Sequence, residues 1–209
     1  MDAPAGEHLD ECPFALDRFD VPHVIETAKS GRANCRGCGR NIARGELRFG
    51  EALPNAYAEG ESLFWFHLVC AACMRPEKFG PMLESRDQPL PDAEWLHQTV
   101  KFGLQHDRVP RLLRAERATS GKAHCRQCRE FVSKGSWRFV LQMFEEGRMQ
   151  PIGTIHIECA RAYFGTVDFL DRVERLTPGL TPADLVEIGR LIRESPSAQL
   201  PSSSEIPPE

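Results

Sequence analysis

Two groups of cysteine and histidine residues are the part of this 209-residue sequence whose chemistry is easiest to name. Their members are Cys35-x2-Cys38 followed after 28 residues by His67-x2-Cys70, and Cys125-x2-Cys128 followed after 27 residues by His156-x2-Cys159. Three thiolates and one imidazole form a closed tetrahedral set for Zn²⁺, whereas a catalytic zinc site keeps one position open for water. We therefore predict two structural zinc ions per chain.

The remaining two cysteines need a separate interpretation. Cys73 lies three residues after Cys70 and could replace His67 as a ligand, but the second group has Ala162 at the matching position. We therefore expect Cys73 and Cys12 to be free thiols. The N-terminal sequence MDAPAGEHLDEC has no basic region and no apolar segment, which excludes a secretory signal and favours a reducing compartment.

An internal repeat surrounds the two groups. Residues 28–49 and 118–139 share ten identities in 22 positions at an offset of 90 residues. Two copies of this length indicate a tandem domain duplication. We predict two zinc-binding domains at 22–109 and 110–194, an acidic disordered arm at 1–21 and a disordered Ser/Pro-rich tail at 195–209.

The elements that must position the ligands can be read from hydrophobic periodicity. Segments 44–51 and 134–144 alternate basic and apolar residues, which predicts short antiparallel strands. Apolar residues recur at helical spacing from 92 to 109 and again after Thr181, which can cap a helix with Pro182 in its first turn. A further helix is expected between residues 167 and 176. The predicted fold class is α+β, with two small zinc-stabilised domains that each combine a short antiparallel sheet with flanking helices.

The charge distribution points to an anionic partner. The net charge is −4, but residues 28–48 carry six bases against one acid, and residues 111–138 carry eight bases against two acids. Positive charge is therefore concentrated around the cysteine pairs. The longest apolar stretch, residues 63–74, is shorter than the roughly 18 residues that a membrane helix needs, so no membrane partner is expected.

The motifs around the ligands resemble the poly(ADP-ribose) polymerase type zinc finger. The resemblance rests on the segments AKSGRANC, LRF and FWFHLVC. The first ends at the ligand Cys35, the second lies between the two ligand pairs, and the third contains His67 and Cys70. The second copy repeats these features through Ser120-Gly121-Lys122-Ala123 and Trp137-Arg138, but has Thr154 in place of Trp65.

The resemblance implies sequence-independent recognition of DNA breaks, ends or distorted duplex. It implies phosphate contacts by Arg32 and Arg48 in the first domain and by Lys122 and Arg138 in the second. It also implies that apolar side chains of the loop before the histidine stack on exposed bases. For this role we favour Tyr57 and Phe144.

Three classes of function compete for this sequence. A zinc-dependent DNA-binding protein is favoured, and a non-enzymatic protein-interaction adapter, with a possible protein partner, is the alternative. An enzyme is disfavoured, because both ligand groups are closed and no nucleotide-binding glycine loop is present. We expect a monomer without DNA. The 21 arginines against five lysines suggest a bacterial cytoplasm with nucleoid DNA, with the nucleus as the alternative.

Overall fold

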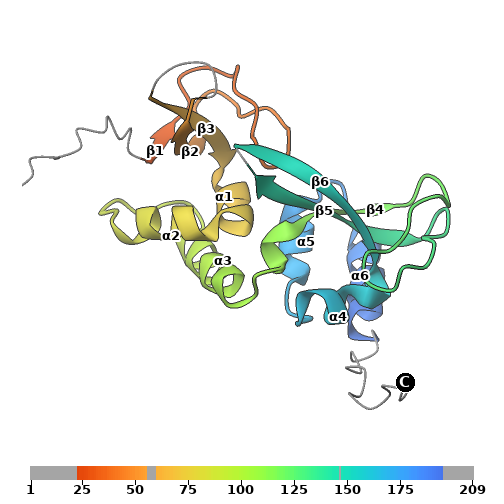
Figure 1. Cartoon of the computed structure of the whole chain (residues 1–209). Helices are drawn as coiled ribbons and strands as arrows, with labels where there is room; N and C mark the ends of the chain where they lie inside the picture. The colour runs from red at the N-terminus through yellow and green to blue at the C-terminus, as the bar shows by residue number, and fades with distance from the viewer. Residues whose placement is uncertain (1–22, 56–59, 146, 195–209) are drawn as a thin grey trace, which may run out of the picture.

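The computed structural model describes residues 23–55, 60–145 and 147–194, so the predicted arm and tail lie outside the described residues. Two similar units lie side by side, each with a sheet and a set of helices (Figure 1). Both sheets are antiparallel and three-stranded, which confirms the predicted α+β class. The predicted domain boundaries stay predictions.

The first unit contains a sheet of order β1-β2-β3 and three helices. Its elements are β1 (Val24–Thr27), β2 (Leu47–Pro54), β3 (Glu61–His67), α1 (Leu68–Met74), α2 (Pro76–Glu84) and α3 (Ala93–Gln105). The long connection between β1 and β2 carries the first cysteine pair, and the histidine ends β3. The sheet and the start of α1 therefore bring the two halves of the ligand group together.

The second unit repeats this order with sheet β4-β5-β6. Its elements are η1 (Val109–Arg111), β4 (Leu112–Arg117), β5 (Trp137–Glu145), β6 (Arg148–His156), η2 (Ile157–Cys159), α4 (Ala160–Phe164), α5 (Leu170–Leu176) and α6 (Pro182–Arg193). The cross-strand register is also repeated, since Arg48 pairs with His67 and Arg138 pairs with His156.

Aromatic side chains fill the space between each sheet and its helices. In the first unit Phe49 of β2 contacts Phe79 of α2 edge-on, with ring centroids 5.2 Å apart. In the second unit Phe139 of β5 contacts Phe169 in the same way at 5.7 Å. All four residues are fully buried, so the alternation predicted for β2 and β5 does place one face of each strand in a core.

The two predicted long helices begin differently. Thr181 and Asp184 form a capping box at the start of α6, as the sequence indicates. Asp92, at the start of α3, has a left-handed conformation with φ of 56° and makes no side-chain cap. Its carboxylate instead accepts a hydrogen bond of 2.6 Å from Arg175 of the second unit.

The units share an interface. Gln142 of β5 is buried and donates to the backbone oxygen of Gly37, 3.0 Å away. Arg172 of α5 is 2% exposed and donates to the backbone oxygen of Thr99 in α3. Trp95 of α3 donates to Asp171 at 2.9 Å. The buried residues of both units form one continuous core, so the folding of the two units is expected to be coupled.

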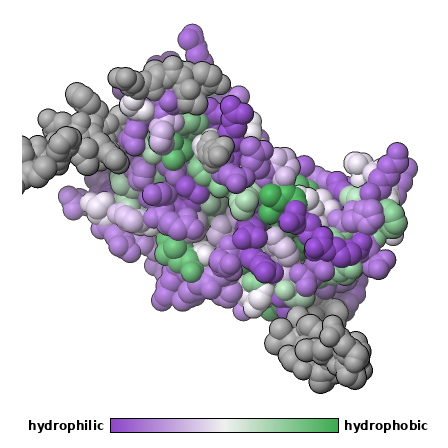
Figure 2. Space-filling view, viewed as in Figure 1, coloured by the Kyte–Doolittle hydropathy of each residue, from purple (hydrophilic) through white to green (hydrophobic). Residues whose placement is uncertain are grey.

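The surface visible in Figure 2 is mostly hydrophilic over both units, with apolar residues in small separate areas. Among the helices of the described residues, none has the length and apolar character that crossing a bilayer requires.

Candidate metal centres and nucleic-acid interface

The first ligand group converges as the sequence predicts. The donor atoms of Cys35, Cys38, His67 and Cys70 all lie within 4.8 Å of one another. Nδ1 of His67 is 3.4 Å from Sγ of Cys38 and 3.9 Å from Sγ of Cys70. These are the edge lengths expected of a tetrahedron with metal–ligand bonds of about 2.0–2.3 Å, so the residues fit a structural Zn²⁺.

The second group has the same geometry. Nδ1 of His156 lies 3.3 Å from Sγ of Cys128 and 3.9 Å from Sγ of Cys159, and Cys125 completes a set within the same 4.8 Å limit. Cys73 lies outside the first donor group and is a free, fully buried thiol whose pKa is raised by burial to about 12. Cys12 lies outside the described residues.

Hydrogen bonds around each centre orient the ligands. Nε2 of His67 lies 3.2 Å from the backbone oxygen of Asn41, and Nε2 of His156 lies 3.1 Å from that of Phe131. A proton on Nε2 leaves Nδ1 free to bind the metal. The backbone N–H of each histidine also donates to the sulfur of the first cysteine, Cys35 or Cys125, at 3.4 Å.

The close approach of the sulfur atoms separates their pKa values. Hydrogen bonds from Cys35 and Cys70 lower the pKa of Cys38, and the hydrogen bond with Cys35 raises that of Cys70. In the second group the hydrogen bond from Cys159 lowers the pKa of Cys125 to about 4. A divalent cation held by either group would displace the protons that its thiols carry.

The second centre is the more accessible. Cys128 is exposed and Cys159 is half-buried, whereas the matching Cys38 is half-buried and Cys70 is buried. Nε of Arg40 also donates to Sγ of Cys38 at 3.4 Å, and the residue 90 positions later is the acid Glu130. The first centre therefore has better shielding and an additional cationic donor.

Two of the four predicted phosphate-contacting residues are free to bind an anion. Arg32 and Lys122 are exposed at matching places before the first cysteine of each group. Within the described residues, no hydrogen bond, ion pair or ring contact engages either side chain. Their positions suit phosphate binding without any rearrangement of the fold.

The other two arginines lie in a different environment. Arg48 donates from Nε and Nη2 to Oε1 of Glu26, and its guanidinium lies 3.5 Å from the ring centroid of Trp65. Arg138 donates in the same way to Oε1 of Glu116. The side chains of Arg48 and Arg138 are only 11% and 14% exposed. The sequence alone did not reveal these carboxylate partners.

Comparison with known protein families identifies the kind of zinc centre. Residues 26–103, which contain the first centre, match the family described as the poly(ADP-ribose) polymerase (PARP) and DNA-ligase zinc-finger region. They form a PARP-type zinc finger. The second unit repeats the sheet and the ligand set of the first, which is consistent with two such fingers in tandem. From here the first unit is called finger 1 and the second unit finger 2.

The similarity to individual proteins extends beyond finger 1. A poly [ADP-ribose] polymerase of Sarcophaga peregrina is 29% identical over 183 residues, covering 77% of this chain and 18% of that protein. Poly [ADP-ribose] polymerase 1 of Gallus gallus is 27% identical over 148 residues, covering 63% of this chain and 14% of the relative. The chain thus spans less than a fifth of the length of these PARPs. Both relatives are animal proteins, which gives no support to the predicted bacterial nucleoid location.

The two aromatic residues favoured for base stacking have different outcomes. Tyr57 lies outside the described residues. Phe144 is half-buried beneath Arg75 of finger 1, whose guanidinium is 3.9 Å from the Phe144 ring centroid, and it also contacts Phe66 at 6.1 Å. Arg75 is held by Glu51, a fully buried carboxylate. In this arrangement Phe144 is part of the interface between the fingers, and its contact with DNA stays a prediction.

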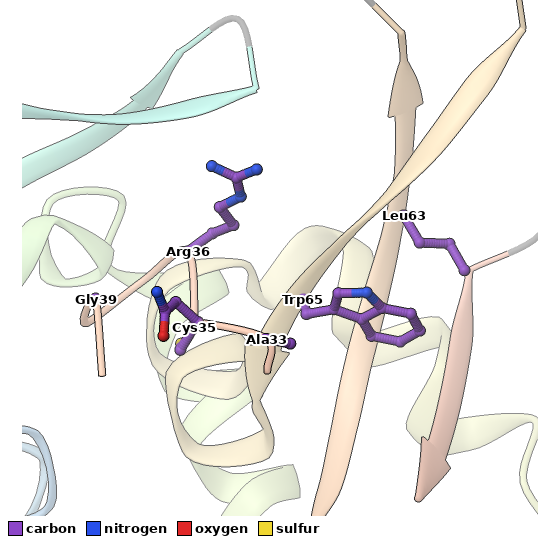
Figure 3. A pocket seen from close by; sticks show the side chains of 7 residues that line it. Ala33, Cys35, Arg36, Gly39, Leu63 and Trp65 are labelled. Carbon is purple, nitrogen blue, oxygen red and sulfur yellow. The ribbon is translucent and has the colours of Figure 1, made fainter. Parts of the chain in front are cut away.

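The hairpin of β5 and β6 packs against finger 1. A side-chain carbon added at Gly147, in its turn, would lie 3.6 Å from the ring of Phe64. Nearby, Leu63, Trp65 and Arg36 line a hollow of about 500 Å³ beside Cys35, and Figure 3 shows Arg36 extending from the cysteine-bearing loop and Trp65 extending from β3. This hollow, beside the first zinc centre, was not predicted from the sequence.

The replacement of Trp65 by Thr154 changes the outer face of finger 2. Thr154 is buried, and its hydroxyl oxygen has no hydrogen-bond partner in the described residues. Trp137 supplies an aromatic ring elsewhere in this finger, where it packs beneath Arg117 at 4.4 Å and donates to Glu187. Each sheet thus contains one tryptophan stacked on an arginine, Trp65 on β3 and Trp137 on β5.

Proposed function

We propose that the tandem fingers bind duplex DNA at breaks, ends or distortions, without regard to sequence, and that this region of the protein is not an enzyme. The observation that carries the proposal is the exposed basic surface around both zinc centres. Finger 1 presents Lys29, Arg32, Arg36, Arg40 and Arg44, and finger 2 presents Lys122, Arg126, Arg129 and Lys134. Three pairs of these basic residues occupy matching places in the two copies, namely Arg32 and Lys122, Arg36 and Arg126, and Arg44 and Lys134. Such a repeated arrangement of positive charge suits a repeating polyanion.

Phosphate contact is assigned first to Arg32 and Lys122, because both are exposed and unpaired. Arg48 and Arg138 have a smaller part in phosphate contact. Each lies on the outer face of its sheet, opposite the zinc-binding histidine, and can offer only a small exposed part of its guanidinium to a phosphate. Backbone contacts of this kind position the protein but do not read sequence, which supports structure-specific binding.

Base stacking is assigned separately in each finger. Tyr57 is retained for finger 1 on the strength of the family resemblance. Phe144 can stack on a base only if the β5–β6 hairpin leaves Arg75 and Phe66 of finger 1. The proposal therefore gives base stacking to Tyr57 and makes stacking by Phe144 conditional on separation of the fingers.

The experiment is a fluorescence titration of the zinc-loaded chain with nicked, blunt-ended, closed intact and single-stranded oligonucleotides at two salt concentrations. Tighter binding to nicked or ended duplex than to closed duplex, weakening steeply with salt, supports the proposal. Absence of salt-dependent binding to any DNA would refute it and favour the protein-interaction adapter. The proposal also includes a nuclear location and a monomeric state without DNA. Of these two, the titration tests only the monomer, through the stoichiometry of binding.

A further inference from the structure

Finger 2 presents a stacked aromatic pair at a place where finger 1 has two asparagines. The rings of His124 and Phe131 lie 4.1 Å apart between centroids with an interplanar angle of 37°, and Phe131 is 60% exposed. The two residues face each other across an isolated β-bridge in the loop that carries the cysteine pair. The same bridge in finger 1 joins Asn34 and Asn41.

The exposed ring of Phe131 is not what closes the loop of finger 2. In finger 1 the side chain of Asn41 donates to the backbone oxygens of Gly31 and Ala33, which fastens the loop internally. Phenylalanine cannot make these bonds, yet the loop of finger 2 keeps the same backbone bonds, including Val132 to Ala123 at 2.8 Å. The loop therefore does not need an exposed aromatic ring to hold its shape.

The exposed ring is held rigidly with respect to the zinc centre. The backbone oxygen of Phe131 lies 3.1 Å from Nε2 of His156, the histidine ligand. The neighbouring backbone bond from Cys125 to Glu130 is 2.8 Å long. A flat apolar surface that is fixed before binding loses little conformational entropy when it contacts a ligand.

The surroundings of the ring are cationic. Lys122, Arg126, Arg129 and Lys134 are all exposed in the same loop, and Glu130 is the one acid between residues 122 and 134. Arg126 is oriented by a hydrogen bond to the backbone oxygen of Ile152. A planar apolar face bordered by cations matches a nucleobase with its own flanking phosphates.

We propose that Phe131, supported by His124, stacks on an unpaired base of a single-stranded DNA overhang or gap next to the duplex held by the fingers. The inference rests on the proposed DNA binding and adds a preference for one kind of break. Stacking on a single base should tighten binding by about fivefold to a hundredfold. A closed duplex keeps its bases paired and gains nothing from this ring.

The test compares wild type and Phe131→Asn, which introduces the residue of finger 1, in binding blunt duplex and the same duplex with a single-stranded overhang. The variant should lose at least about fivefold in affinity for the overhang substrate and bind blunt duplex unchanged. An overhang of abasic nucleotides keeps the phosphates and removes the bases, so wild type and variant should bind it equally. Val186→Asn, at an apolar residue of α6 that is 69% exposed, is the matched control and should behave as wild type.

Zinc content and melting temperature of Phe131→Asn should match those of the wild type. Equal loss of affinity for blunt and overhang DNA, or no loss for either, overturns the inference while leaving DNA binding intact. A lowered melting temperature with unchanged binding would also overturn it, because the ring would then have only a structural role. If wild type binds none of the duplexes, the proposed function itself fails, which is a different result.

Discussion

Oε1 of Glu26 accepts two hydrogen bonds from Arg48, one of 3.2 Å from Nε and one of 2.5 Å from Nη2. The same pair recurs 90 residues later as Glu116 and Arg138. In both fingers the pair joins the first two strands of the sheet at positions directly opposite each other. An arginine in this position stabilises the sheet. It has less free charge to offer an anion than an exposed basic side chain without a carboxylate partner.

We expect Arg48→Ala to destabilise the protein and Arg32→Ala to leave its stability almost unchanged. Arg48→Ala removes the partner of Glu26 and the contact with Trp65, so it should lower the free energy of unfolding by about 1–2 kcal/mol. Arg32→Ala changes an exposed, unpaired side chain and should leave stability within about 0.5 kcal/mol of wild type. Urea denaturation of both variants measures the difference. Equal stability of the two would show that the Glu26–Arg48 pair does not hold the sheet.

The stability provided by Glu116 should depend on pH. Burial opposes ionisation of this carboxyl, but hydrogen bonds from Arg138 and Arg114 outweigh it and lower the pKa below its ordinary value of 4.5. A lowered pKa in the folded state means that the contribution is fully present above the ordinary value and disappears as pH falls through the lowered one. Glu116→Gln should therefore be less stable than wild type at pH 7, by about 0.5–1 kcal/mol for a partly solvated pair.

The difference between wild type and Glu116→Gln should shrink as the pH falls below 4.5. Comparing the two proteins at each pH removes the common effect of acid on the zinc ligands. A difference that stays constant down to the acid transition would contradict the role of the ionised carboxylate.

Phe144→Ala should act on stability. The ring lies between Arg75 and Phe66 at the junction of the fingers, and its removal should cost about 2 kcal/mol, less than a fully buried phenylalanine. Chemical denaturation measures the cost. Phe144→Leu, which keeps much of the apolar volume, should recover part of it. Unchanged stability together with weaker binding to nicked DNA would instead assign Phe144 to base stacking.

Zinc should leave finger 2 first. Cys128 is exposed, whereas the ligands of finger 1 are better covered and Cys38 receives a hydrogen bond from Arg40. A chelator should therefore release two zinc ions per chain in two phases, measured with a metal-sensitive dye. The fast phase should be missing in Cys125→Ala and present in Cys35→Ala. Simultaneous release of both ions in the wild type would contradict this order.

The ligand groups could be predicted from the sequence because zinc coordination constrains residue type and spacing locally. The same holds for α6, whose start is fixed by Thr181, Pro182 and Asp184 within a few residues. The helix after Asp92 was also predicted, although Asp92 does not act as its side-chain cap. Local chemistry and the repeat were sufficient for these features.

The interface between the fingers could not be predicted in this way. Whether Phe144 contacts DNA or Arg75 depends on how two similar units pack, and no periodicity in the β5–β6 segment contains that information. The partners of Arg48 and Arg138 were missed for a related reason, since Glu26 and Glu116 become neighbours only through the register of the sheets. The matching positions of Glu26 and Glu116 in the repeat were the signal that could have revealed them.

The salt dependence of DNA binding by Arg32→Ala/Lys122→Ala tests the central claim most directly. The Kd of wild type and of this double variant for nicked duplex should be measured across a series of salt concentrations. If these two side chains contact phosphates, the slope of log Kd against log salt should fall by roughly two units, and intact and nicked duplex should both bind more weakly. An unchanged slope, in a variant with wild-type zinc content and melting temperature, would contradict the account.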